Sequence, residues 1–307
     1  WCAADHHDRL AIAHEELERF ANGDPTFRAD EVIRLSLAGA QHKISAIQDN
    51  GLWWPGSQDA STHILKFDSP RFANLSVNEF FMRCLAEHLD LPVAAARLDV
   101  TTSKPFLVVE RYDRRVVEGR VERLHQEDFC QALALSHHHK YEGTFGPTLT
   151  LIAQTIREHS YRPARDIQSL LRWVMFNVLA GNADGHAKNL SLLRTEAGLQ
   201  LAPFYDLVCT RAYQNLDRLM AFSMAGSRDA DTYGVMHWKG LATSLGVAPR
   251  VVLAELKRMH REYEDGIAFA TQETRVFVDD PNVLDPLISE VAKRFRAASN
   301  VLNAKGW

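Results

Sequence analysis

The chain has 307 residues, of which 46% are hydrophobic and 24% are charged, and its formal net charge is −4 at pH 7. This composition is typical of a globular protein with enough apolar material for one large domain or two smaller ones. Because the net charge is slightly negative, no molecule-wide basic field indicates direct nucleic-acid binding. Polar residues interrupt every long apolar stretch, so we expect no membrane-spanning segment, and no signal peptide is visible.

The four cysteines, Cys2, Cys84, Cys130 and Cys209, lie far apart and form no CxxC pair. This spacing favours reduced thiols in a cytosolic protein over a disulfide framework or a zinc site. We therefore expect a cytoplasmic protein.

The first third of the sequence predicts short strands and helices in alternation. Residues 10–20 predict a short helix, and the apolar positions between Val77 and Leu89 recur at the 3.6-residue spacing of a longer one. Runs rich in β-branched and aromatic residues predict strands. These strands are expected at 44–48, 62–68, 95–100 and 106–112.

After Asp113 the sequence predicts mainly helices. We expect them over 125–135, over 167–179, near 250–264 and over 284–302, with one hairpin of strands at 189–193 and 199–203. The pattern predicts an α+β, two-lobed fold. Its smaller mixed lobe would span residues 1–113 and its larger, mainly helical lobe residues 114–307. A cleft between two such lobes is a common place for a ligand.

The segment GNADGHAKNLSLL, residues 181–193, concentrates polar side chains directly after an apolar helix. Asp184 is followed by Asn189, and the hairpin's second strand leads to Asp206. Phosphoryl transfer needs a carboxylate that orients the nucleophile, together with carboxylate and amide oxygens that hold Mg²⁺ against a triphosphate. Lys188 is placed to neutralise charge on the transferred group.

Two other interpretations of this segment stay open from spacing alone. One is an ordinary polar turn, with Gly181 and Gly185 ending the helix. The other is a metal site built on His186 and the two aspartates, which lacks a second histidine at a helical or hairpin interval. The spacing favours phosphoryl transfer over both.

Lys66 lies in the apolar strand THILKFD and requires a counter-charge or a phosphate if it is buried. Glu79, on the following helix, is a candidate partner. Two alternatives remain: Lys66 as a solvated edge-strand lysine, and Glu79 as half of a capping box with Ser76.

Two loops are candidate nucleotide contacts. Gly39 in SLAGAQHK, residues 36–43, allows a close backbone approach to phosphate, or it marks a plain turn. In VVERYDRR, residues 108–115, the backbone of Glu110 and Tyr112 can hydrogen-bond an adenine edge, while the arginines fit a solvated charge cluster equally well. The triplet His137–His139 fits a polar loop better than a metal site, because adjacent histidines rarely share one metal.

Together these segments resemble the HipA family of bacterial toxin kinases, the serine/threonine kinase arm of type II toxin–antitoxin modules. The matching pieces occur in family order. They are SLAGAQHK (36–43), THILKFD (62–68), NEFFMRCLAEHLDLPVAAA (78–96), VVERYDRR (108–115), HQEDFCQALAL with KYE (125–142), DGHAKNLS (184–191) and PFYD (203–206).

The resemblance implies a protein-kinase-like fold that uses ATP and Mg²⁺. It makes Asp184 the catalytic base with Lys188 beside it, and Asn189 and Asp206 the metal ligands. The residues expected to contact the nucleotide are Ser36, Ala38, Gly39, Lys66, Glu79, Glu110, Arg111, Tyr112, Asp113 and His186. Ser36 falls on the family's regulatory serine, whose phosphorylation expels the loop, since the added charge repels the nucleotide's phosphates.

The family function implied is that of a toxin that phosphorylates an aminoacyl-tRNA synthetase and so stalls translation. The implied partner is a HipB-like helix-turn-helix antitoxin, which binds the operator DNA. The alternatives are a catalytically silent, nucleotide-binding partner of the antitoxin, and a small-molecule kinase of related fold.

The sequence departs from the family in two respects. Full-length members carry a small β-rich subdomain before the SLAGAQ loop, so we expect a compact or N-terminally truncated member. His42 stands where an acidic residue is frequent.

Overall fold

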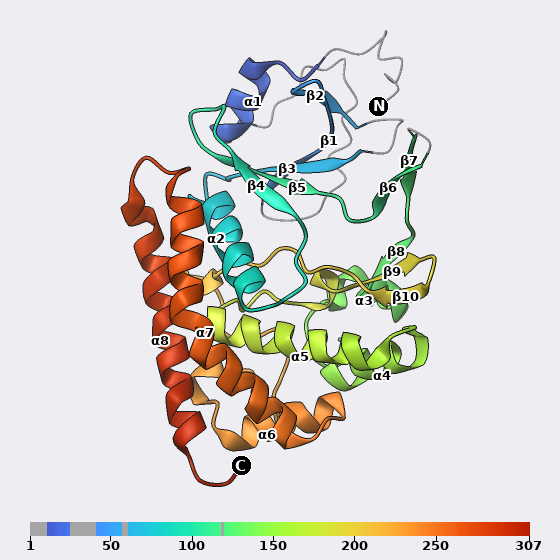
Figure 1. Ribbon diagram of the computed structural model, residues 1–307, viewed down its shortest axis with the longest axis vertical. Helices are drawn as coiled ribbons and strands as arrows, with labels where there is room; N and C mark the ends of the chain where they lie inside the picture. Colours follow the sequence, from blue (N-terminus) through green and yellow to red (C-terminus); the bar gives the residue numbers. More distant parts are fainter. Residues whose placement is uncertain (1–10, 25–40, 57–60, 118–119) are drawn as a thin grey trace. The chain divides into compact units, whose positions relative to one another are not determined.

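The computed structural model describes residues 11–24, 41–56, 61–117 and 120–307. The chain forms two compact units, which are described separately below (Figure 1). Unit 1 comprises Trp1–Phe80, Ala94–Leu124 and Thr274–Val283, and unit 2 comprises Phe81–Val93, His125–Glu273 and Leu284–Trp307.

Unit 1 is built on a five-stranded antiparallel sheet of order β2-β1-β3-β5-β4. The strands are β1 (His42–Asp49), β2 (Leu52–Pro55), β3 (His63–Phe67), β4 (Ala96–Asp99) and β5 (Phe106–Glu110). Helix α1 (His14–Ala21) packs its apolar residues Leu17 and Phe20 into the same core as Phe67. Lys66 therefore lies on the central strand, opposite Lys43 on one side and Leu107 on the other.

Other elements also belong wholly or partly to unit 1. Strands β6 (Arg114–Val117) and β7 (Arg120–Arg123) form a separate antiparallel pair. Helix α2 (Leu75–His88) begins in unit 1 and continues into unit 2.

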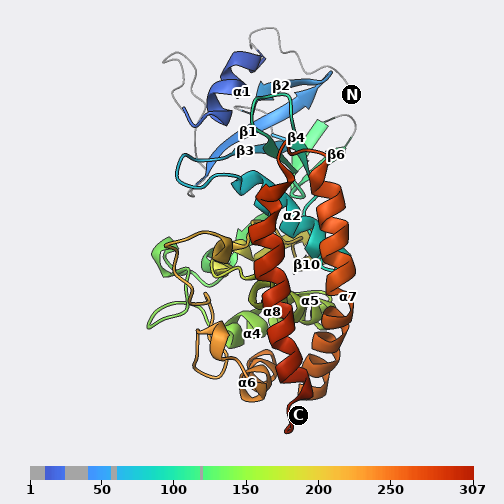
Figure 2. The same cartoon turned by 90° about the vertical axis from the view of Figure 1, so that its left-hand side faces the viewer.

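Unit 2 is mainly helical. Its helices are α3 (Phe129–Ala132), α4 (Leu149–His159), α5 (Pro163–Ala180), α6 (Val235–Leu245), most of α7 (Pro249–Arg275) and α8 (Asp285–Asn303). Helix α5 is the most buried of them and packs against α4 and α8. Helices α7 and α8 run side by side (Figure 2), where the rings of Tyr263 and Phe295 stack with centroids 4.7 Å apart. A three-stranded sheet, β10-β9-β8, adjoins this helical core.

Segment 125–135 was predicted as one helix, and this prediction is wrong. Gln126–Asp128 form strand β8, which pairs with β9 (Ser191–Thr195), while β9 in turn pairs with β10 (Gly198–Leu201). Only Phe129–Ala132 are helical. The change occurs at Asp128, whose carboxylate accepts the backbone N–H of Gln131 at 2.9 Å and so caps the helix.

The α+β class is confirmed, with a mixed unit and a mainly helical one. Strand β2, the β6–β7 pair and helices α4 and α6 were not predicted. None of the helices in the described ranges combines the length and the apolar character needed to cross a bilayer.

Candidate active site

The loop after helix α5 is held in a fixed conformation by hydrogen bonds at its base. Gly181 ends the helix with φ 73°, a left-handed conformation that glycine adopts without a steric penalty. Asn182 donates its backbone N–H to the Asn177 carbonyl at 2.9 Å and its side-chain amide to Asn177 Oδ1 at 2.8 Å. Thr210 Oγ1 accepts the N–H of Ala183 at 2.8 Å. The next residue, Asp184, therefore projects from a rigid support.

Gly185 allows this loop to lie directly against helix α5. A Cβ at this position would lie 2.8 Å from both Cγ and Nδ2 of Asn177, closer than real Cβ contacts occur. The glycine predicted from the sequence as a helix breaker is thus required by close packing.

Asp184 is the most exposed of the predicted catalytic residues, with 54% of its side chain accessible. One of its oxygens, Oδ1, accepts a hydrogen bond from the hydroxyl of Tyr141. Burial, and secondly this hydrogen bond, raise the pKa of Tyr141 far above its usual range. The phenol therefore remains a proton donor. The carboxylate is therefore both oriented and open to solvent.

His186 is buried beside Asp184 and is neutral. Burial lowers its pKa to about 4, against the opposing effect of the Asp184 charge. Its Nε2 atom lies 3.9 Å from Asp184 Oδ1 and accepts a hydrogen bond from the Lys140 ammonium at 2.8 Å. A histidine that accepts at Nε2 carries its proton on Nδ1, and that buried atom has no hydrogen-bond partner among the residues that the structure describes.

Asn189 and Asp206, the two residues predicted as metal ligands, lie close together. Asn189 Nδ2 is 3.4 Å from Asp206 Oδ2, and Asn189 Oδ1 accepts the backbone N–H of His186 at 3.0 Å. No cluster of three His, Cys, Asp or Glu side chains suited to a metal occurs in the part of the chain that the structure describes. A carboxylate and an amide oxygen nevertheless fit Mg²⁺, which takes few protein ligands and completes its shell with phosphates and water.

Lys188 forms an ion pair with a carboxylate at the start of α3. Its ammonium lies 3.3 Å from Asp128 Oδ2, the carboxylate that caps α3. Its carbonyl accepts the hydroxyl of Tyr205 at 2.7 Å. Lys188 thus ties the loop to α3 and to the segment before Asp206.

In unit 1, Lys66 and Glu79 form the buried ion pair that was one of the two readings of these residues. Lys66 Nζ lies 2.5 Å from Glu79 Oε1, and 4% and 7% of the two side chains are exposed. The capping-box alternative is wrong, because the helix begins at Leu75 and Ser76 lies inside it. The Ser76 hydroxyl instead donates to the carbonyl of Lys66 at 3.2 Å.

The predicted adenine-contacting segment carries an internal ion cluster. Arg111 forms two hydrogen bonds to the carboxylate of Asp113, at 3.0 and 2.9 Å, and Arg114 adds a third at 2.6 Å. Burial alone would raise the pKa of Asp113, but these arginines hold it below its usual range. The Arg111 and Asp113 side chains are thus engaged with each other, whereas Glu110 is exposed.

Ser36, Ala38 and Gly39 lie outside the described residues. The structure resumes at Gln41, whose side-chain amide donates to the Ser76 hydroxyl at 3.3 Å.

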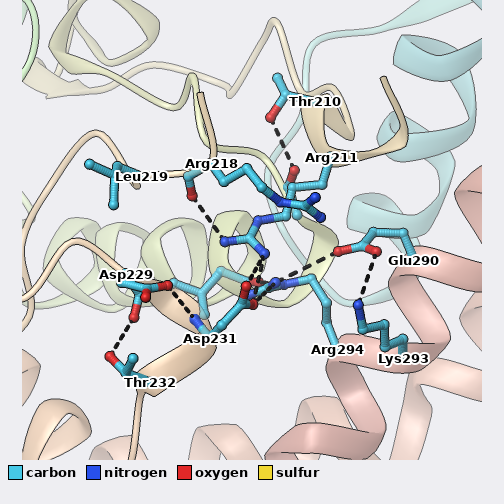
Figure 3. Close-up of polar contacts among 12 residues, drawn as sticks. Thr210, Arg211, Arg218, Leu219, Asp229, Asp231, Thr232, Glu290, Lys293 and Arg294 are labelled. Atoms are coloured by element: carbon cyan, nitrogen blue, oxygen red, sulfur yellow. Dashed lines mark hydrogen bonds and ion pairs between the residues drawn. The ribbon is translucent and has the colours of Figure 1, made fainter. Parts of the chain in front are cut away.

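Two buried arginines and the carboxylate of Asp231 form a charge cluster near the end of helix α5 (Figure 3). Arg211, in the short helix η3 (Thr210–Ala212), binds both oxygens of Asp231 at 2.7 and 2.9 Å. Arg294 of α8 binds Asp231 at 3.0 Å and the Val178 carbonyl, in the last turn of α5, at 2.5 Å. The cluster therefore joins α5, η3, α8 and η4 (Ala230–Thr232).

Sequence reasoning missed Lys140 and Tyr141 as site residues. The KYE segment, residues 140–142, was noted only as part of a resemblance. Its proximity to Asp184 arises from contacts between residues more than forty positions apart, which no local pattern reveals.

Known proteins resemble this chain in sequence and in fold. Residues 35–267 match the family described as HipA-like C-terminal domain. The chain is 37% identical over 272 residues to Y4mE of Sinorhizobium fredii, and 32% identical over 276 residues to the serine/threonine-protein kinase toxin HipA of Shewanella oneidensis. These alignments cover 88% and 83% of this chain, and 65% and 62% of the two relatives, so the chain spans less than two thirds of their length.

Two solved structures share the fold. HipA in the complex of HipA, HipB and operator DNA from Shewanella oneidensis superposes with a TM-score of 0.83 at 26% identity, over 99% of this chain and 76% of that one. The Helicobacter pylori proinflammatory kinase CtkA superposes with a TM-score of 0.57 at 16% identity, over 87% and 91% of the two chains, which is a likeness of fold. The chain has the two-lobed, kinase-like α+β fold of these proteins, and it belongs to the HipA-like C-terminal domain family.

Proposed function

We propose that the chain is an ATP- and Mg²⁺-dependent serine/threonine protein kinase. The observation that carries the proposal is the arrangement of Asp184, Asn189 and Asp206 in unit 2: an exposed, oriented carboxylate next to a carboxylate–amide pair. A hydroxyl nucleophile needs the first, and Mg²⁺-bound phosphates need the second.

The residues divide the work as follows. Asp184 accepts the proton of the attacking hydroxyl, with Tyr141 fixing the direction of its carboxylate. Asn189 and Asp206 would hold Mg²⁺, which neutralises phosphate charge when bound. Lys66, whose ammonium is oriented by Glu79, binds nucleotide phosphate.

We further propose the biological setting of the toxin relatives. The chain would act with a HipB-like antitoxin that contacts operator DNA, and its protein substrate would be an aminoacyl-tRNA synthetase. The support is the identity with HipA and the superposition on HipA in its HipB–DNA complex.

The test is transfer of labelled phosphate from ATP to protein. In lysate with Mg²⁺, the wild type should label a protein band that Asp184→Asn does not label. Label confined to small molecules would indicate a small-molecule kinase, and nucleotide binding without any labelling would indicate a silent partner of the antitoxin.

Autophosphorylation on Ser36 is a second expectation of the same proposal. Intact-mass analysis after incubation with Mg²⁺ and ATP should show one added phosphate, which Ser36→Ala abolishes. Full labelling of Ser36→Ala would move the modification to another residue, with Ser45 and Ser61 as the nearest alternatives on this lobe.

A further inference from the structure

We propose that Lys140 is the cation that contacts the terminal phosphate of the bound nucleotide. The sequence pattern had indicated Lys188 for this role. The inference rests on the proposed kinase function and names a residue for it. It starts from the different surroundings of two lysines near Asp184.

No carboxylate of the described residues lies within ion-pair distance of Lys140. Its contacts there are Nε2 of His186, at 2.8 Å, and the face of the Tyr141 ring, whose centroid is 4.9 Å from Nζ. A ring nitrogen that accepts a hydrogen bond and an aromatic face orient an ammonium without placing an opposite charge beside it. Lys140 is therefore positioned to contact an anion.

The ammonium of Lys188 is already paired with a carboxylate. It lies 3.3 Å from Asp128, and only 32% of its side chain is exposed. Asp128 is itself anchored by the backbone of α3, so release of Lys188 toward a phosphate would leave that carboxylate without its cation.

Lys140 is also fixed next to the proposed base. His186 Nε2 lies between the two residues, 2.8 Å from Lys140 Nζ and 3.9 Å from Asp184 Oδ1. The Lys140 carbonyl accepts the N–H of Ala187 at 3.1 Å, so a backbone hydrogen bond also joins the segment of Lys140 to the loop that contains Asp184.

The neighbouring Glu142 completes the attachment. Its carboxylate accepts the backbone N–H of Ser223 at 2.6 Å and the Ser223 hydroxyl at 2.7 Å. The three residues 140–142 thus bind His186, Asp184 and Ser223 in turn, which holds the Lys140 ammonium in place near Asp184.

A cation at this place answers an electrostatic requirement. A phosphoryl group that approaches Asp184 brings negative charge toward a carboxylate, which is unfavourable without a positive group close by. Lys140 supplies that group, so its charge should matter for a nucleotide with a terminal γ-phosphate and much less for one without it.

The experiment is isothermal titration calorimetry with Mg²⁺ and either AMP-PNP or ADP. Lys140→Met should weaken AMP-PNP binding by about tenfold or more, the usual contribution of a charge-assisted hydrogen bond, and should alter ADP binding far less. Lys140→Gln, which keeps a donor for His186 but removes the charge, should show the same selective loss. Lys140→Arg should retain most of the affinity, as should Lys257→Met, which changes an exposed lysine of α7.

Several results would overturn the inference. They are unchanged AMP-PNP binding in Lys140→Met and Lys140→Gln, an equal loss for both nucleotides, or a selective loss in Lys188→Met in place of Lys140→Met. Absence of nucleotide binding by the wild type would instead refute the proposed function, and this inference with it.

Discussion

The buried pair of Lys66 and Glu79 shows how one residue's chemistry depends on another's. Both side chains are almost fully removed from water, so each charge carries a desolvation cost that the opposite charge of the pair helps to offset. Such a pair contributes little net stability, but it holds the ammonium in one place. The main effect of this pair is therefore to position the Lys66 ammonium, and its contribution to stability is small.

Replacing either Lys66 or Glu79 alone should lower the stability of the protein strongly, whereas replacing both together should lower it much less. Lys66→Met removes the ammonium that faces the buried Glu79 carboxylate and should lower the free energy of unfolding by about 3 kcal/mol. The double variant Lys66→Met/Glu79→Leu should recover most of that loss. Denaturant titrations of the wild type, both single variants and the double variant measure the coupling, and additive losses would contradict it.

Gly185 is a position where one added methyl group should affect both stability and activity. Gly185→Ala places a methyl group 2.8 Å from Asn177, the residue that holds the base of the loop. We expect a loss of about 1–3 kcal/mol in stability together with a drop in phosphate transfer. Gly234→Ala is the matched control, because a Cβ there meets no atom within 4 Å. Equal behaviour of the two variants would contradict the packing argument.

At the scale of elements, the cluster of Arg211, Asp231 and Arg294 holds the end of helix α5, from which the loop with Asp184 begins. Two buried arginines from η3 and α8 converge on one carboxylate of η4, and Arg294 also binds a carbonyl of α5. Elements that are distant in sequence are joined by these few bonds. Weakening the shared carboxylate should loosen all of them.

The pH dependence of Asp231 follows from its pKa. Burial raises this pKa, but the hydrogen bonds and charges of Arg211 and Arg294 outweigh burial and hold it below the usual range. A lowered folded-state pKa means that the stabilisation is present above the unfolded value, about 4, and is lost as pH falls through the folded value. Asp231→Asn should therefore destabilise the protein at pH 7, by on the order of 1 kcal/mol, since the half-exposed carboxylate is screened by solvent.

At acidic pH, the free energy of unfolding of Asp231→Asn should differ less from that of the wild type. Urea titrations at neutral pH and at a pH below the folded pKa of Asp231 provide the measurement. A difference between the two proteins that stays constant, or grows, as pH falls would contradict the ion-pair account.

At the scale of the whole molecule, the described thiols are protected by burial. Burial raises the pKa of Cys84 to about 11 and that of Cys209 to about 12, and it also raises the pKa of Cys130. Since the thiolate is the reactive form, maleimide should label these three cysteines slowly at pH 7.5 and rapidly after denaturation. Peptide mass spectrometry resolves each site, and fast native labelling of any of the three would contradict the burial.

Much of this molecule could be predicted from local patterns. The strand around Lys66, the helix that carries Glu79 and the loop at Asp184 each follow from periodicity and composition over a few residues. The boundary at Asp128 was missed because the polar residues Gln126–Asp128 carry no strand pattern of their own, and only their pairing with β9 makes them a strand.

The contacts that complete the site could not be predicted in this way. Tyr141 meets Asp184, and Lys140 meets His186, only because the chain returns after more than forty residues. The partnership of Arg211, Asp231 and Arg294 also depends on tertiary packing alone, since polar residues at these spacings carry no local signal.

The most direct test of the central claim is the rate of phosphate transfer in Asp184→Asn, a variant that preserves the shape of the side chain. With nucleotide affinity checked separately, the transfer rate at saturating Mg²⁺ and ATP should fall by at least about 100-fold, the usual effect of losing a general base. Asp265→Asn, which changes an exposed carboxylate of α7, should transfer at the wild-type rate. Equal transfer by Asp184→Asn and the wild type would contradict the assignment of Asp184 as the base.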